Sequence, residues 1–270
     1  MKNINRFLRV LGLLILFGML VSGCDKNARR KKELSGMKSN FTFEQPVSTG
    51  IDSIEADMKV GTILLREGDA FVVRASYSHK QLKPEVRESD GKLMITQSKK
   101  VQEKFSDANV KCELEVTCPH GMSGGKAFSH LKLFTNLGNA TVQGISSELT
   151  EINCAVGNLK VSDCSLGKTD LKAGLGNVSV DNGRYGTLSV GTETGNQSIS
   201  NADFSTLDSK TELGNIRIAV LEPLSYYALD LNVGTGRINA GGEKHSQSYR
   251  AGDGEKKISA SSGTGNITLE

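Results

Sequence analysis

Three carboxylates have the type and spacing that acid–base chemistry could use. Glu151, Asp170 and Asp208 each lie six residues before a Gly-Asn pair of a 19-residue repeat, which predicts one outward-facing column. Converging carboxylates can hydrolyse a glycosidic bond or hold a cation. However, Lys172 and Lys210 follow Asp170 and Asp208 by two residues, and a lysine on the same strand face compensates the carboxylate charge. A solvated face of mixed charge is therefore favoured over a polysaccharide-active enzyme.

The histidines and cysteines form no recognisable catalytic or metal-binding pattern. Cys118-Pro119-His120 contains two metal ligands, but neither their number nor their spacing makes a zinc site. The four histidines lie in separate segments without a repeated acid or serine partner: His79, His120, His130 and His245. We therefore expect no catalytic residue, no metal and no cofactor. This expectation predicts that the chain is not an enzyme.

The cysteines that follow Cys24 are even in number, which leaves disulfides open in an exported protein. They are Cys112, Cys118, Cys154 and Cys164. Cys112 and Cys118 alternate in phase with Leu114 and Val116, so both should point inward. Buried small apolar side chains are therefore favoured over disulfides.

A loop near the C-terminus is the candidate recognition element. Gly236 and Gly265 are ten residues further apart than one repeat, so residues 241–250 can project from the structure. His245, Tyr249 and Arg250 are its candidate binding residues, because tyrosine and arginine are favoured at contact sites. A passive insertion is the alternative. The final strand, Ile267–Leu269, would leave an unpaired edge that could self-associate unless this loop covers it.

These residues must be positioned by a ladder of Gly-Asn pairs. The pairs recur every 19 residues, as Gly138-Asn139, Gly157-Asn158, Gly176-Asn177, Gly195-Asn196 and Gly214-Asn215, with echoes at Gly236-Arg237 and Gly265-Asn266. A unit this short cannot bury a core alone, so the units must stack. Glycine and asparagine tolerate positive φ, and the pairs are therefore interpreted as structural turns.

Apolar residues flank each glycine with a period of two. In the repeat of Gly176 they include Val178 and Val180 after the glycine and Leu171 before it, which predicts two inward-facing strands. A mostly aromatic column ten residues before the glycine would close a third corner: Phe128, Leu166, Tyr185, Phe204 and Tyr226. We predict an all-β fold, a right-handed parallel β-helix or β-solenoid with rungs of about 19 residues, its handedness by analogy with parallel crossovers. Residues 119–270 hold the repeats, and residues 43–118 form an irregular, strand-rich beginning.

The N-terminus has the features of an export signal. Lys2, Arg6 and Arg9 precede the apolar run Val10–Val21, and Val21-Ser22-Gly23-Cys24 resembles the bacterial lipobox, which implies cleavage after residue 23 and acylation of Cys24. Residues 24–42 would be a flexible tether with a basic cluster that could bind anionic headgroups. Without the signal's three basic residues, 30 basic groups balance 30 acidic ones. No basic strip follows the repeats, so nucleic-acid binding is not expected.

The iterated pattern also carries a family resemblance. Residues 171–180 (LKAGLGNVSV) and the ending 263–269 (GTGNITL) resemble the bacterial putative adhesin domains of β-solenoid fold, over roughly residues 48–270. The resemblance implies a cell-envelope location and a binding role, and it supplies no catalytic motif.

Together, these patterns predict a lipid-anchored cell-envelope protein, on the periplasmic face or the cell surface, that binds a glycan or an envelope or host protein without catalysis. The alternative is a periplasmic structural or envelope-sensing module that acts through a protein partner.

Overall fold

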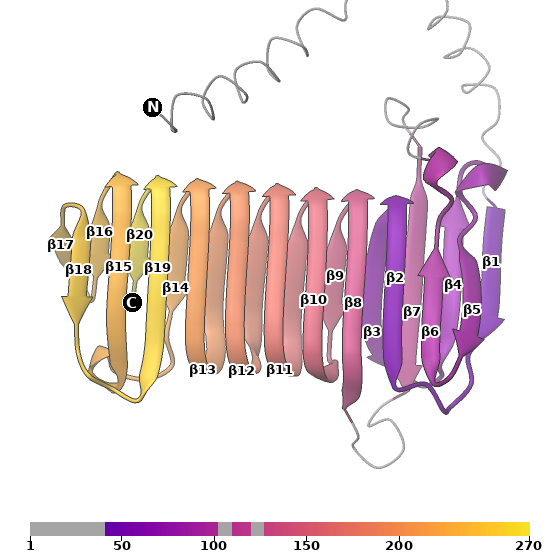
Figure 1. The fold of residues 1–270 in the computed structure, drawn as a ribbon, viewed down its shortest axis with the longest axis horizontal. Helices are drawn as coiled ribbons and strands as arrows, with labels where there is room; N and C mark the ends of the chain where they lie inside the picture. Colours follow the sequence, from indigo (N-terminus) through magenta and orange to yellow (C-terminus); the bar gives the residue numbers. More distant parts are fainter. Residues whose placement is uncertain (1–40, 102–109, 120–126) are drawn as a thin grey trace, which may run out of the picture. The chain divides into compact units, whose positions relative to one another are not determined.

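The computed structural model describes residues 41–101, 110–119 and 127–270, all within one compact unit. Cys24 and the predicted signal and most of the tether lie outside the described residues. The central part stacks strands side by side at even spacing (Figure 1). Its strands are β8 (Phe128–Leu137), β9 (Ala140–Gln143), β10 (Ser146–Val156), β11 (Leu159–Leu175), β12 (Val178–Thr194), β13 (Gln197–Leu213) and β14 (Ile216–Ala219).

The rungs pair in parallel with a register of 19 residues. Leu171 lies opposite Val190, and Val180 lies opposite Ile199. Each of the 17-residue strands β11 to β13 begins after one Gly-Asn corner, bends, and ends before the next. The inward columns are buried, which confirms the predicted β-solenoid and its 19-residue repeat. We call the surface formed by the strand segments that end at the turn glycines the pre-glycine face. The surface formed by the segments that begin after them is the post-glycine face.

The glycine corner is sterically closed to any side chain. Gly176 has φ +148°, and a Cβ built on it would lie 1.9 Å from the carbonyl oxygen of Gly157 in the preceding rung. The neighbouring asparagines form a hydrogen-bonded ladder. The Asn177 N–H donates to Oδ1 of Asn158 at 3.0 Å, and the Asn196 N–H donates to Oδ1 of Asn177 at 2.8 Å. Both residues of the Gly-Asn pair therefore serve the predicted turn: the glycine leaves room for the neighbouring carbonyl, and the asparagine hydrogen-bonds to the next rung.

The position three before the glycine supplies a second set of contacts that the sequence did not suggest. Its buried hydroxyl or thiol groups donate to glycine carbonyls of the corner column. Thr135 Oγ1 donates to the Gly61 oxygen at 2.8 Å, Cys154 Sγ to Gly138 at 2.9 Å, and Ser262 Oγ to Gly214 at 2.9 Å. Small polar residues in this core column therefore satisfy backbone groups that the turn would otherwise leave unpaired.

The N-terminal part continues the same stack irregularly, as predicted. β2 (Ser53–Val60) pairs in parallel with β8, and Gly61 begins the glycine column, with φ +142°. The other elements are β1 (Phe41–Pro46), β3 (Thr62–Gly68), β4 (Val72–Tyr77), η1 (Lys80–Leu82), β5 (Glu85–Ser89), β6 (Lys92–Thr96) and β7 (Cys112–Pro119). β1 begins two residues before the expected start at 43 and pairs antiparallel with β4. Antiparallel strands thus close this end of the stack.

The last rungs do not stack in chain order, and the predicted unpaired C-terminal edge is wrong. The elements here are η2 (Leu224–Tyr226), β15 (Tyr227–Thr235), β16 (Ile238–Ala240), β17 (Glu243–His245), β18 (Ser248–Ala251), β19 (Lys256–Thr264) and β20 (Ile267–Leu269). β19 inserts between β13 and β15, and β20 between β14 and β16. Because β20 is hydrogen-bonded on both sides, it offers no edge for self-association.

The aromatic column also departs from prediction at its end. Tyr226 is 59% exposed, whereas Tyr227 is buried and lies 6.0 Å from Phe204 between ring centroids. The short helix η2 replaces the usual corner before β15, so the inward position shifts by one residue.

We predict that Gly176→Ala destabilises the fold strongly, by about 3 kcal/mol or more, because positive φ and a backbone clash act together. The matched control is Gly191→Ala, where the added Cβ would meet its nearest atom at 3.7 Å. Urea unfolding of both variants measures the difference. Equal stability of the two variants would contradict the closed corner.

Candidate functional site

The carboxylate column is a solvated face rather than a converging site. Glu151 and Asp170 are adjacent in register, but Ser189 separates Asp170 from Asp208. Asp170 Oδ2 lies 2.5 Å from Lys172 Nζ, which is the charge compensation that the sequence predicted. Glu151 lies 4.0 Å from His130 Nε2. Within the described ranges, no cluster of three or more His, Cys, Asp or Glu side chains could hold a metal ion.

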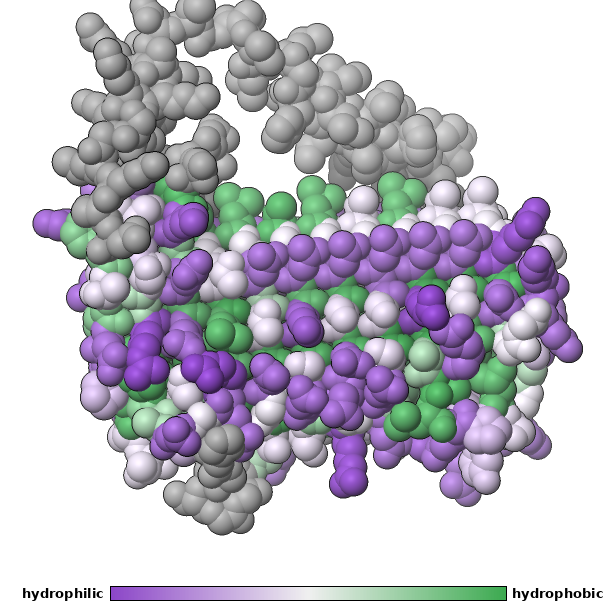
Figure 2. Space-filling model, turned by 180° about the vertical axis from the view of Figure 1, so that it is seen from behind, coloured by the Kyte–Doolittle hydropathy of each residue, from purple (hydrophilic) through white to green (hydrophobic). Residues whose placement is uncertain are grey.

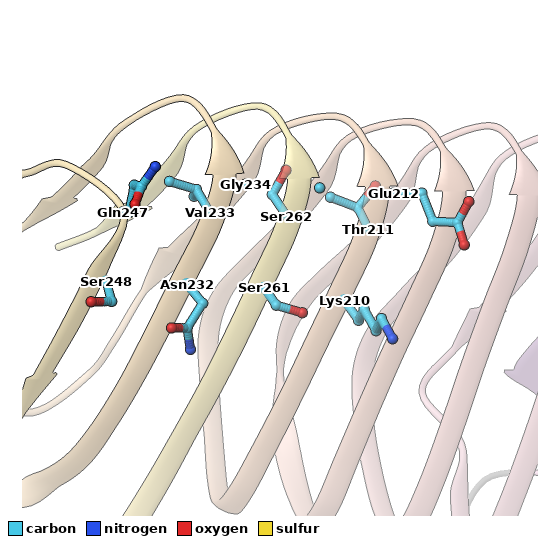
Figure 3. Close-up of a pocket in the computed structure, with 11 residues that line it drawn as sticks. Lys210, Thr211, Glu212, Asn232, Val233, Gly234, Gln247, Ser248, Ser261 and Ser262 are labelled. Carbon is cyan, nitrogen blue, oxygen red and sulfur yellow. The ribbon is translucent and has the colours of Figure 1, made fainter. Parts of the chain in front are cut away.

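An open groove crosses the pre-glycine face at its C-terminal rungs. Glycines occupy the position two before the turn in β19 and β15, at Gly263 and Gly234, while Glu212 and Gln247 stand on either side (Figure 3). We call this the C-terminal groove. Its remaining lining residues come from four adjacent strands: Lys210, Thr211, Asn232, Val233, Ser248, Ser261 and Ser262. The missing side chains of two glycines thus create a hollow that is rimmed by hydrogen-bonding groups.

A second corner carries a column that sequence reasoning missed. Six residues after the turn glycine stand Gly144, Asp163, Asn182 and Asn201, all with positive φ. Asn182 Nδ2 donates to Asp163 at 2.8 Å, and this hydrogen bond is the main cause that holds the pKa of Asp163 below its usual value. The recurrence of Gly, Asp and Asn at this spacing was the available signal.

A lysine beside the second corner is paired with two carboxylates. Lys256 Nζ lies 2.7 Å from Asp203 and 2.8 Å from Glu222, and hydrogen bonds to these two carboxylates raise the pKa of Lys256.

Comparison with known proteins identifies the chain. A family model described as Toastrack DUF4097 matches residues 51–270, most of the sequence. The chain belongs to the Toastrack DUF4097 family. The solenoid described above is thus a Toastrack domain, as the resemblance to adhesin-type solenoids anticipated. No curated protein matches the sequence.

Several solved structures are similar to the chain at low sequence identity. A "putative adhesin" from Bacteroides fragilis is similar with a TM-score of 0.49 and 12% identity, covering 86% of this chain and 98% of its own. A "putative lipid binding protein" from Parabacteroides distasonis has a TM-score of 0.45 and 14% identity, covering 86% and 97%. A "putative cell adhesion protein" from Clostridium sporogenes has a TM-score of 0.36 and 14% identity, covering 86% and 99%.

The predicted recognition loop folds back as a cap on the Toastrack stack. β17 pairs antiparallel with β16, and β18 with β15. His245 and Tyr249 lie in register with the inward residues Ile238 and Leu231, and their rings stack with centroids 4.0 Å apart. Arg250 points outward and lies 3.1 Å from Asp230. The structure therefore separates the three candidates: two close the end of the core, and one lies on its surface.

All four cysteines of the described Toastrack domain are free and buried, as the strand alternation predicted for Cys112 and Cys118. Burial raises the pKa of Cys112 and Cys118 to about 12, and that of Cys154 and Cys164 to about 11. The thiols are therefore protonated at neutral pH. Thiols in the unfolded chain ionise at lower pH than these buried ones. The contribution of the buried, protonated thiols to the stability of the fold is therefore complete below about pH 8.5 and is lost as the pH rises towards 11 or 12.

A line of partly exposed apolar residues is the surface feature that the sequence hid. From β8 onward, the residue just before the turn glycine is apolar in four rungs: Leu137, Val156, Leu175 and Leu213. We call these four the apolar crest. Val156, Leu175 and Leu213 are 41%, 53% and 50% exposed. By period-two alternation these residues have the position of inward-facing side chains. The chain leaves the core at the corner, however, so their side chains lie on the surface.

The crest lies beside the asparagine ladder. Figure 2 shows a continuous hydrophilic row along the stacking axis, with protruding apolar residues next to it. None of the helices in the described part of the chain is long and apolar enough to span a bilayer.

We predict that Tyr249→Ala lowers the unfolding free energy by about 2 kcal/mol, since it removes one ring of the stacked His245–Tyr249 pair that covers the end of the core. Arg250→Ala, the matched control on the same strand, should cost less than about 1 kcal/mol because the Arg250–Asp230 pair is exposed. Urea unfolding and hydrogen exchange of β15 and β16 measure both effects. A similar cost for the two variants would contradict the capping role.

Proposed function

We propose that this chain is a lipid-anchored cell-envelope protein whose Toastrack domain binds an extended polar partner, such as a glycan, without catalysis. The C-terminal groove is the observation that carries the proposal. It is an open surface formed by four neighbouring strands, and an open groove accepts a chain that continues past both of its ends.

The chemistry of the groove suits a ligand rich in hydroxyl groups. Lys210 and the amides of Asn232 and Gln247 supply donors, and Glu212 supplies acceptors. Ser248 and Ser261 can act as either. Donors and acceptors at the rim orient a polar ligand, while the glycine backbone lets it approach closely. Glu212 is the only carboxylate among the groove's lining residues, so the groove lacks the carboxylate pair that glycoside hydrolysis generally uses.

Anchoring is the second part of the proposal. It rests on the lipobox sequence Val21-Ser22-Gly23-Cys24, in which acylated Cys24, carrying chains such as palmitate, would hold the protein on the membrane. The neutral balance of the remaining chain is consistent with attachment through lipid rather than through a large basic surface.

A protein partner is the alternative, and the apolar crest favours it. Half-exposed aliphatic side chains in a straight line would gain from burial against another protein surface, whereas a glycan offers little apolar area. In that case the domain would be a structural or envelope-sensing module in the periplasm.

We expect Ser261→Tyr to block the C-terminal groove and weaken glycan binding at least tenfold. Asn153→Tyr is the matched control, because Asn153 has the same position in its rung, four before the turn glycine, but lies outside the groove. Envelope polysaccharides on an array, followed by calorimetry, measure the binding. If the two substitutions weakened glycan binding equally, the binding site would not be the C-terminal groove. Turnover of a polysaccharide that Asp170→Asn abolishes would overturn the non-catalytic proposal.

We expect Cys24→Ala to move the protein from the membrane fraction to the soluble fraction. The Asn153→Tyr chain, whose lipobox is intact, should stay in the membrane fraction. Fractionation followed by immunoblotting measures the distribution, and protease treatment of intact cells then separates surface from periplasmic exposure. Membrane association that survives Cys24→Ala would contradict acyl anchoring.

A further inference from the structure

The C-terminal groove carries one hydrogen-bonding side chain on each of its four strands. These side chains lie opposite one another in the register of the strands and form a row across them (Figure 3): Lys210, Ser261, Asn232 and Ser248. We call these four the polar row. Because adjacent strands lie about 4.8 Å apart, the row spans about 14 Å along the stacking axis. A ligand that contacts the whole row must present a polar group at each of these steps.

The spacing of the polar row distinguishes between extended polymers. An extended polypeptide turns one side chain towards the row about every 6.7 Å, so it falls out of step with strands that lie about 4.8 Å apart. A straight chain of β-1,4-linked hexoses advances about 5 Å per ring, which keeps it within about 1 Å of the strand spacing over three steps. An α-1,4-linked chain curves into a helix and leaves a straight row. The polar row therefore fits a straight β-linked chain, with one ring on each strand.

The floor beside the polar row suits the flat face of a sugar ring. Gly263 and Gly234 follow Ser261 and Asn232 by two residues on the same strands, and both glycines are exposed, so the backbone is uncovered at the two central steps. A hexose ring has a face of C–H groups and a rim of hydroxyl groups. The face can pack on the uncovered backbone while the rim hydroxyls meet the side chains of the polar row.

The charges of the groove favour a neutral chain. Among the groove's lining residues, Lys210 and Glu212 carry one charge each, of opposite sign, and both lie on β13. The lining residues of β19, β15 and segment 247–248 are uncharged. A polysaccharide with a carboxylate on every ring would therefore find one counter-charge, at one end of the groove and beside a carboxylate.

We propose that the C-terminal groove binds a neutral, straight polysaccharide of β-1,4-linked hexoses, which lies along the stacking axis with one ring on each of the four strands. The inference rests on the proposed function, because it gives the chemical class and the direction of the glycan in that groove. The two central rings lie on the glycine backbone of β19 and β15, and the outer rings meet Lys210 and Ser248. Four rings fill the groove, and further rings continue past its ends without adding contacts.

Calorimetry with the full chain, solubilised in a detergent that has no sugar headgroup, tests the inference. The β-1,4-linked probes are cellotetraose, mannotetraose and chitotetraose, and maltotetraose is the α-1,4-linked control. At least one β-linked probe should bind at least fivefold more tightly than maltotetraose. In the series of that probe, the disaccharide should bind at least tenfold more weakly than the tetrasaccharide, and the affinity of the hexasaccharide should lie within about twofold of it.

Asn232→Ala should weaken tetrasaccharide binding at least threefold, because it removes one hydrogen-bonding side chain from the polar row. Asn153→Ala is the matched control and should leave the affinity unchanged, since Asn153 is the same residue type at the same position, four before the turn glycine, but lies outside the groove. Circular dichroism of both variants checks that the fold is intact.

Three results would overturn the inference: no β-linked tetrasaccharide that binds more tightly than maltotetraose, an affinity that does not depend on the number of rings, or an equal loss of binding in the two asparagine variants. If an array glycan nevertheless binds the chain and Ser261→Tyr weakens that binding, the groove remains a glycan site and only the straight, axial arrangement is wrong. If no array glycan binds the chain, the proposed glycan binding is wrong as well.

Discussion

The close approach of successive backbones at the glycine corner is the constraint on which the rest of the structure depends. At Gly176 the space for a Cβ is taken by the carbonyl oxygen of the rung before it, 1.9 Å away, so the corner admits glycine alone. The asparagine ladder and the buried hydroxyl and thiol donors then satisfy the groups that the corner exposes. Because this arrangement repeats without a change of register, the inward columns stack into one continuous core.

The same constraint explains where recognition can occur. Since the corner and the core columns are committed to stacking, ligand contacts are left to outward side chains and to places where the repeat changes. The C-terminal groove arises where two rungs carry glycine before the turn, and the apolar crest arises where the chain leaves the core. Chemical catalysis has less support, because stacking spreads Glu151, Asp170 and Asp208 along the surface and pairs Asp170 with Lys172.

Most features within one rung could be predicted from the sequence, and most contacts between distant rungs could not. The turn role of Gly-Asn, the inward columns and the buried cysteines follow from spacing alone. The crest was hidden because Leu175 has the alternation phase of a core residue, and alternation does not show where a strand leaves the core. His245 and Tyr249 were predicted to be available for binding, whereas the structure pairs their strands with β16 and β15. The sequence does not show in which direction the preceding turn leads the chain, so this pairing could not be predicted.

The sequence by itself determined the 19-residue rung, the all-β class and the glycine corner, because these depend on local φ preferences and on side chains that alternate within about ten residues. Only the tertiary structure decided the order of the last rungs. In the stack, β19 precedes β15 and β20 precedes β16, although both follow them in the sequence. The β17–β18 segment closes the C-terminal end of the stack. Rung edges present similar backbone donors and acceptors, so local sequence cannot specify which two edges meet. Long-range packing and ion pairs such as Lys256–Asp203 distinguish among those pairings.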